Sequence, residues 1–546
     1  MADRKTSWRY IPFFTTTIPI PQPGNCLLRT RALLLIELLL TPAPALSFFV
    51  KSMDLCYLYC MKKIVLLSLL LFLTVGLPAG HDGHDCFTIV VGNKASADGS
   101  VLLAHNEDDS GRLLVKIHKV PARSFSRDEA LALKNGLLLP QPSAAPGLLW
   151  LEIPESDFAD SYVNELGVAV TSDACPSRED KGELSEGGIG FSLRRLIAER
   201  ATSAREGVRI AGELIARLGY NSSGRTYIIA DAGEGWLLHA VKGKRWIAAR
   251  VPDNEVAVIA NRYTISGIDL SDEDRFLGSP DIIDYAVHRG WYDPRRDGEF
   301  DFARAYSDPG AYADLRNILR QWRGSDLLAA RPPKADAPLP FSFKPRHGLR
   351  PRDLFKVLRD HYEGSKHDLS NRYRNGSPNS GKNRTICTAS TQYAFVAHLR
   401  NWPAADIAHV VWIALRRPDS NAFSPWYPSM ASAPDGFSRE KADSAWKNHF
   451  AALPAQAFAD PNLAFTTYAR LSEAVDREYR GRIEKVQKIW RNFEEFLFED
   501  LKDHEKEFSF LLQRDRSLAR RVIDNYIHGL EYRKWFLAAD LLKEMK

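Results

Sequence analysis

The sequence predicts an α+β protein, a layered domain of hairpin strands and helices followed by a helical extension. Two observations support this prediction. Short runs rich in β-branched and aromatic residues occur in pairs around turn residues, which is typical of hairpins. Apolar residues at three- and four-residue spacing are grouped between these pairs, and again from Lys441 to Lys546, which indicates helices. A mean hydropathy of −0.28 excludes a multi-span membrane protein.

The expected elements follow one another without an internal repeat. A first hairpin pairs 87–91 with 101–104 across turn residues, and a second turn at 165–167 divides two strands within 162–171. The elements expected after these are helices at 193–201 and 204–218, strands at 227–230, 236–240, 246–249 and 256–259, helices at 311–322 and 351–362, and strands at 394–399 and 409–414.

Charge and cysteine content are uneven along the 546 residues. Residues 1–85 carry eight Lys and Arg against five Asp and Glu, a net charge of +3. Residues 86–546, the body of the protein, carry the other +2 of the total +5 and are therefore nearly neutral. A neutral body argues against nucleic acid as a partner. The body holds Cys86, Cys175 and Cys387, which show no CxxC spacing. We expect no metal and no organic cofactor, and we expect Cys175 and Cys387 to be packed thiols, with a bridge between them as the alternative.

The first 85 residues look like a targeting region. Residues 61–80 combine a basic start, an apolar run and small residues at the end, which predicts a signal peptide, with a retained anchor as the alternative. Residues 1–60 are interpreted as a non-native or unstructured extension upstream of a true start at Met61. Residues 81–85 are interpreted as a short pro-segment. The expected location is therefore secreted or periplasmic, with no stable membrane insertion after signal cleavage.

Several blocks of the body resemble a known family. The longest block, CFTIVVGNKASADGS, begins at Cys86 and is followed by HNED at 105–108. Further blocks are NELGVA at 164–169, GGIG at 187–190, IAERA at 197–201, ANRY at 260–263, LRDHYEG at 358–364 and RTIC at 384–387. Together they resemble peptidase family C69, secreted dipeptidases of the N-terminal-nucleophile (Ntn) hydrolase class related to bile-salt and penicillin V acylases. The resemblance implies a four-layer αββα Ntn-hydrolase sandwich over 86–430, which leaves 431–546 as the helical extension.

Cys86 is the candidate nucleophile. A cysteine that becomes the first residue carries a thiol and an α-amine together, and an amine that titrates near ~8 can take the thiol proton. No separate histidine base is then needed. The alternative is a buried strand cysteine without chemistry.

The resemblance implies two further catalytic residues. Asp108 matches the aspartate that holds the amine or thiol of the nucleophile, the alternative being an ordinary aspartate in an acidic turn. Asn261 matches an asparagine whose amide helps to bind the oxyanion. Such a donor lowers the activation free energy by ~3 kcal/mol. Its alternative is an asparagine at a strand end in a turn.

The resemblance also implies a set of substrate-binding residues. His105 stands where relatives often carry arginine, which leaves open whether it pairs with the thiolate or with a substrate carboxylate. Asn106 lies in the same block. A second oxyanion donor is expected near Asp173, where relatives use asparagine. The later family arginine is Arg320 or Arg316, with a solvated helix face as the alternative for both.

These features predict a secreted cysteine Ntn hydrolase that cleaves linear amide bonds through a thioester on Cys86. The resemblance implies dipeptides or short peptides as substrates. One alternative is an amidase or acyltransferase acting on N-acyl amino acids or bile-salt-like conjugates. A second is a non-catalytic periplasmic binding protein. For the extension, packing against the sandwich and formation of a homo-oligomer are both open.

Overall fold

The computed structural model describes residues 86–110, 113–380 and 384–545. The segments interpreted as extension, signal peptide and pro-segment, residues 1–85, lie outside the described residues. Within the described residues, none of the helices combines the length and the apolar character needed to cross a membrane.

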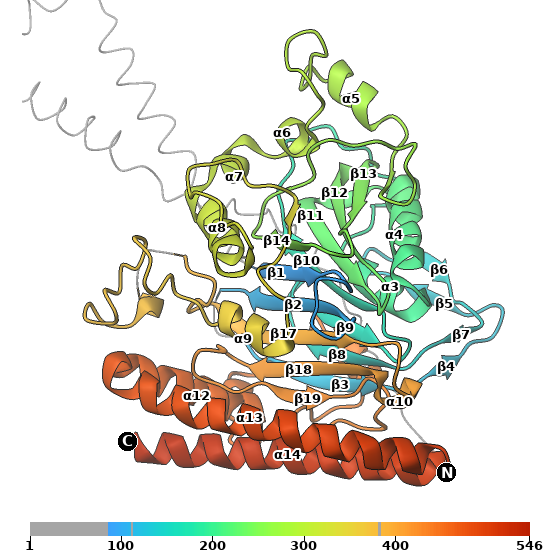
Figure 1. Cartoon of the computed structure of the whole chain (residues 1–546). Helices are drawn as coiled ribbons and strands as arrows, with labels where there is room; N and C mark the ends of the chain where they lie inside the picture. The colour runs from blue at the N-terminus through green and yellow to red at the C-terminus, as the bar shows by residue number, and fades with distance from the viewer. Residues whose placement is uncertain (1–85, 111–112, 381–383, 546) are drawn as a thin grey trace, which may run out of the picture. The chain divides into compact units, whose positions relative to one another are not determined.

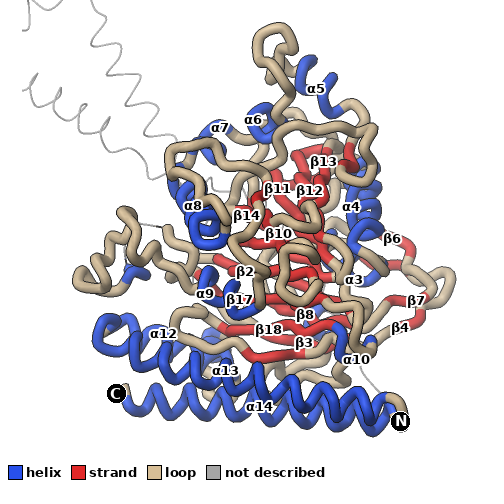
Figure 2. Tube along the Cα trace, in the orientation of Figure 1, coloured by secondary structure: helices blue, strands red, loops and turns tan. Residues whose placement is uncertain are grey.

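Two antiparallel sheets lie at the centre of the chain (Figures 1 and 2). The first sheet has the strand order β16-β14-β1-β2-β17-β18-β19 and the second has the order β15-β13-β12-β11-β10-β9-β8-β3. The strands of the first sheet are β1 (Phe87–Val91), β2 (Val101–Asp108), β14 (Val256–Ile259), β16 (Ser342–Phe343), β17 (Thr391–Leu399), β18 (His409–Leu415) and β19 (Ser424–Trp426). Those of the second are β3 (Lys116–Val120), β8 (Leu148–Glu152), β9 (Ser161–Asn164), β10 (Ala169–Ala174), β11 (Tyr220–Ala230), β12 (Gly235–Gly243), β13 (Trp246–Arg250) and β15 (Phe276–Gly278).

Helices cover the outer face of each sheet. Helices α3 (Leu193–Arg200) and α4 (Ala204–Leu218) pack on the second sheet, while α8 (Leu315–Leu328) and α9 (Pro351–Leu358) pack on the first. Each central strand is therefore buried on both faces, which explains why β1 and β2 are buried along their whole length instead of alternating. The expected αββα sandwich is confirmed.

The remaining elements are short, apart from the C-terminal helices. They are the small strand pairs β4 (Arg123–Ser124) with β7 (Ala144–Ala145) and β5 (Ala130–Ala132) with β6 (Leu138–Pro140), the helices α5 (Ile282–His288), α6 (Phe302–Tyr306), α7 (Pro309–Ala313), α10 (Ala405–Ala408) and α11 (Ala442–Asn448), and the 3-10 turns η3 (Pro378–Ser380) and η4 (Ala455–Ala459). The expected helix at 311–322 is divided at Asp314, which caps α8 through its side chain.

The C-terminal helices pack against the first sheet. Helices α12 (Ala464–Arg477), α13 (Tyr479–Leu512) and α14 (Arg516–Glu544) contact one another, and they reach β18 and β19 (Figure 1). Their buried apolar side chains belong to the same hydrophobic core as the strands of the sandwich. Of the two roles left open for the extension, packing against the sandwich is the one that the structure displays. The domain boundary at residue 430 stays a prediction.

One close approach between α4 and the second sheet gives a stability test. A Cβ added at Gly212 would collide with the indole ring of Trp246. We expect Gly212→Ala to destabilise the protein by about 1–3 kcal/mol, because a rigid ring must move. Gly529 in α14 has open space around it. Gly529→Ala should therefore stabilise by up to ~1 kcal/mol through helix propensity. Urea denaturation of both variants measures the difference, and equal stabilities would contradict the packing of α4 on β13.

Candidate active site

Strand register brings the candidate residues together at one end of the first sheet. β1 pairs antiparallel with β2, so that Phe87 is opposite Asn106 and Thr88 is opposite His105. Cys86, directly before β1, therefore lies beside the last two residues of β2. On the other side β14 pairs Ile259 with Thr88, which brings Asn261 to the same end.

The Cys86 thiol is buried, with 1% of the residue exposed, and it donates a hydrogen bond to Glu107 Oε1 at 3.1 Å. Burial raises the pKa of this thiol well above its ordinary value, and the charges of Glu107, Asp173 and Asp108 raise it further. This environment therefore disfavours the thiolate form of Cys86. Glu107 was not among the residues expected from the sequence.

A buried chain of hydrogen bonds extends from this thiol to the second sheet. His105 Nε2 lies 3.1 Å from Glu107 Oε2, and His105 Nδ1 lies 2.8 Å from Thr88 Oγ1. The Thr88 hydroxyl in turn donates to Asp173 Oδ1 at 2.7 Å. The side chains of Glu107, His105, Thr88 and Asp173 therefore form one continuous buried line of polar contacts.

The carboxylates at this end respond differently to burial. For Glu107 burial would raise the pKa, but the hydrogen bond and charge of His105, with Arg194, hold it below its ordinary value. For Asp173 burial prevails over His105 and Thr88 and raises the pKa to about 6. For Asp108 burial raises the pKa well above the ordinary value. A hydrogen bond from the Thr391 side chain acts in the opposite direction on the Asp108 pKa but does not outweigh burial.

Arg320 connects Cys86 to Asn261. Its Nη1 donates to the Cys86 carbonyl oxygen at 3.2 Å, and its Nη2 donates to Asn261 Oδ1 at 2.9 Å and to Asn317 Oδ1 at 2.8 Å. Arg316, the other candidate, forms an ion pair of 2.6 Å with Asp314 instead. Of the two arginines, the structure places Arg320 beside the thiol residue.

The two candidate asparagines are held in different ways. Asn261 has a positive φ of 54°, a left-handed conformation that glycine and asparagine adopt more readily than most residues, and its Nδ2 donates to the Ala174 carbonyl at 2.9 Å. Asn106 donates from Nδ2 to the carbonyls of Leu358 and Ile386, each at 2.9 Å. The Asn106 amide therefore ties β2 to two loops, and its substrate-binding role stays a prediction.

Metal-type donors converge at two places among the described residues. Cys86, His105 and Glu107 bring their donor atoms within 4.8 Å of one another, and so do His361, Cys387 and Asp419. The first group contains the candidate nucleophile. The three cysteines of the body are free and buried, so Cys175 and Cys387 do not form the alternative bridge.

The first strand of the αββα sandwich thus follows a buried thiol, with Asn261 and Arg320 beside it. The chain belongs to peptidase family C69, whose model matches residues 85–478. It is accordingly an enzyme that hydrolyses peptide or amide bonds, as the sequence predicts.

Curated relatives agree with this assignment. A probable dipeptidase of Salmonella dublin is 29% identical over 63% of this chain and 81% of its own length. One from Latilactobacillus sakei is 27% identical over 64% of this chain and 75% of its own. Among solved structures, penicillin V acylase from Agrobacterium tumefaciens aligns over 60% of this chain and 82% of its own, at 13% identity and a TM-score of 0.31. At that level of superposition, the assignment depends on the sequence match.

The contact between Glu107 and the thiol can be tested by reactivity. We expect Glu107→Gln to lower the pH at which the Cys86 thiol ionises, because it removes a charge that raises the thiol pKa and keeps the side-chain size. Alkylation rates by iodoacetamide between pH 6 and pH 11 measure this, with Cys86→Ala used to subtract Cys175 and Cys387. An unchanged or higher midpoint would show that the Glu107 charge does not act on this thiol.

Proposed function

We propose that the protein is a secreted cysteine-type dipeptidase in which Cys86 becomes the N-terminal residue and acts as the nucleophile. The observation that carries the proposal is the place of Cys86 directly before β1, where its thiol contacts Glu107 and Asp108 and its carbonyl accepts a hydrogen bond from Arg320. The names of the relatives in Salmonella dublin and Latilactobacillus sakei support dipeptides as the substrates.

The buried carboxyl group of Asp108 supports a free amine at Cys86. A buried carboxylate is costly unless its oxygens accept enough hydrogen bonds, and burial raises the pKa of Asp108 in spite of the hydrogen bond from Thr391. The peptide nitrogen of Cys86 becomes an α-amine once the preceding residues are removed. We propose that Asp108 accepts a hydrogen bond from this amine and so holds it next to the thiol.

The proposed reaction is acyl transfer in two steps. The α-amine takes the thiol proton, the sulfur attacks the substrate carbonyl carbon, and a tetrahedral oxyanion forms. The C–N bond then breaks, the leaving amine takes the proton from the α-amine, and a thioester remains on Cys86. In the second step water gives a proton to the α-amine, attacks the thioester and releases the acid, which restores the thiol.

Charge around the thiol is proposed to stabilise the anionic states. The Asn261 amide has two N–H groups, of which one donates to Ala174, so the second is available for the oxyanion. His105 and Arg320 supply positive charge beside the thiol, and Glu107 orients the S–H group. His105 thus acts on the thiol through Glu107, which lies between them, at the position where relatives often carry an arginine.

Export and processing complete the proposal. The signal-like segment 61–80 directs the chain out of the cytoplasm, and residues 81–85 are then lost, which exposes the Cys86 amine. The substrate is a short peptide, and no cofactor takes part in the proposed chemistry.

The start of the mature chain is directly testable. We expect mass spectrometry of the active enzyme to find an N-terminal peptide that begins at Cys86, and we expect Cys86→Ala to abolish the release of amino acids from dipeptides. Cys86→Ser should turn over slowly, because a hydroxyl ionises far less than a thiol near neutral pH. An active preparation whose chain begins at His81 or earlier would contradict the proposal, and so would full activity of the Cys86→Ala variant.

Asn261 allows a cleaner test than alanine scanning alone. Its positive φ suits glycine, so Asn261→Gly removes the amide without backbone strain, whereas Asn261→Ala adds strain. We expect both variants to lower kcat by about 10²-fold or more with a smaller effect on KM, because an oxyanion donor acts mainly in the transition state. If Asn261→Gly keeps the wild-type kcat while only Asn261→Ala is impaired, Asn261 has a backbone role alone.

A further inference from the structure

A second buried cluster of reactive side chains lies outside the active site, where three loops meet at the end of the first sheet. His361 follows α9, Cys387 precedes β17 and Asp419 follows β18. All three are buried, with at most 1% exposed, and their donor atoms lie within 4.8 Å of one another. His361 Nε2 is 3.6 Å from Asp419 Oδ2. The proposed reaction uses none of these three residues.

The His361 ring is held so that one nitrogen faces this cluster. Its Nδ1 lies 3.2 Å from Glu363 Oε1, and Glu363 is itself fixed by the Tyr373 hydroxyl at 2.6 Å and by the His361 backbone N–H. The other nitrogen, Nε2, is buried and lies 3.6 Å from Asp419 Oδ2, and the His361 ring also shares a hydrogen bond with the Cys387 side chain. A carboxylate on one ring nitrogen and a second nitrogen directed at other potential ligands is the usual arrangement of a metal-binding histidine.

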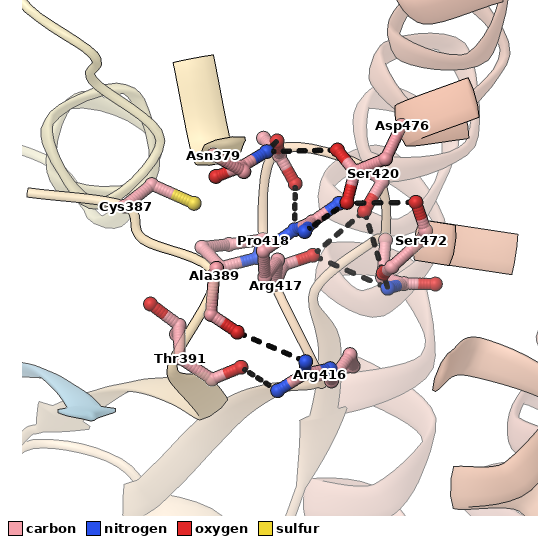
Figure 3. Close-up of polar contacts among 12 residues, drawn as sticks. Asn379, Cys387, Ala389, Thr391, Arg416, Arg417, Pro418, Ser420, Ser472 and Asp476 are labelled. Carbon is pink, nitrogen blue, oxygen red and sulfur yellow. Dashed lines mark hydrogen bonds and ion pairs between the residues drawn. The ribbon is translucent and has the colours of Figure 1, made fainter. Parts of the chain in front are cut away.

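The charges around the cluster are compatible with a cation. Arg417 lies 3.4 Å from Asp419 Oδ1, but its Nη1 is paired with Asp476 at 2.6 Å. The surroundings of the cluster therefore contain three carboxylates, those of Asp419, Asp476 and Glu363, and one arginine, Arg417. Figure 3 shows the sulfur of Cys387 pointing toward this Arg417 network from the neighbouring loop.

Two further side chains reach the same carboxylate. The Tyr479 hydroxyl donates to Asp419 Oδ2 at 3.0 Å, and Asn379 Nδ2 donates to it at 3.2 Å. Among the described residues, the other amide atom, Asn379 Oδ1, is a buried acceptor without a hydrogen-bond partner (Figure 3 labels Asn379). An unsatisfied buried acceptor is unusual, and this one belongs to a side chain that contacts Asp419.

We propose that His361, Cys387 and Asp419 bind a divalent metal ion of the zinc class. Sulfur, imidazole nitrogen and carboxylate oxygen are the ligands that zinc prefers, and adjacent ligands of a tetrahedral zinc ion lie about 3.3–3.7 Å apart, close to the Nε2–Oδ2 separation. Binding releases the Cys387 thiol proton to solvent, together with the Nε2 proton of His361 when the ring is protonated, and metal–sulfur and metal–nitrogen bonds form in their place. The fourth position is open to water or to Asn379 Oδ1.

The proposed ion has a structural role. It joins the loops before β17 and after α9 and β18 to Tyr479, the first residue of α13. The Cys387 backbone N–H also donates to the Asp360 carbonyl at 3.1 Å, and the carbonyls of Leu358 and Ile386 hold Asn106 of β2. Loss of the ion should loosen these loops and the start of the C-terminal helices.

The test measures metal binding in a variant in which the other group of metal-type donors, Cys86 with His105 and Glu107, has lost its cysteine. Full-length protein carrying Cys86→Ala is stripped with a chelator, dialysed against zinc and analysed by elemental mass spectrometry. We expect about one ion per chain, a higher melting temperature with zinc, and a thiolate-to-metal charge-transfer band when cobalt replaces zinc. Adding Cys387→Ser or His361→Gln should weaken zinc binding at least ~10-fold.

The matched control is Cys175→Ser in the same background, which removes a buried free thiol from outside both donor groups and should keep the ion. Absence of zinc from the Cys86→Ala protein would overturn the proposal, as would equal binding in Cys387→Ser and Cys175→Ser. If the cluster variants fail to fold, the cobalt spectrum of the Cys86→Ala protein decides, because a spectrum without the thiolate band contradicts a Cys387 ligand. None of these readouts depends on catalysis.

Discussion

The antiparallel pairing of β1 with β2 is the constraint on which the active site depends. It places Cys86 beside Glu107 and Asp108, and it places Thr88 beside His105. The same strand pair is buried between helices and the second sheet, so the groups at its end are removed from water. A thiol, an imidazole and several carboxylates therefore interact at low dielectric, where each contact has a larger effect than at a surface.

Charge balance around the thiol follows from this burial. Three carboxyl groups, those of Glu107, Asp108 and Asp173, lie near one thiol, and His105 and Arg320 offset them. Removing one partner from such a buried set leaves a charge or a donor unsatisfied, which costs several kcal/mol. The arrangement also gives the proposed α-amine a defined place, since Asp108 is buried beside Cys86 and its pKa stays raised in spite of the hydrogen bond from Thr391.

Sequence reasoning predicted the sandwich, the family and the strand end at which the site lies, because hairpin spacing and the block after Cys86 are local signals. It missed Glu107 because the expected strand ended at 104, whereas β2 continues to Asp108. Alternation along the longer strand places His105 and Glu107 on one face and Asn106 on the other, which agrees with their partners. The choice between Arg316 and Arg320 could not be made from the sequence, because it depends on the orientation of α8. The cluster of His361, Cys387 and Asp419 could not be predicted either, because its residues come from three loops that no local sequence pattern connects.

The central claim is that Cys86 forms a covalent acyl-enzyme through a free N-terminal position. The most direct measurement is mass spectrometry of the mature enzyme quenched during turnover of a slow dipeptide or activated ester substrate. The account predicts an added acyl mass on the peptide that begins with Cys86, bound through sulfur and released by hydroxylamine. An acyl group on any other residue, or turnover without a trapped thioester in an enzyme whose Cys86 is not N-terminal, would contradict it.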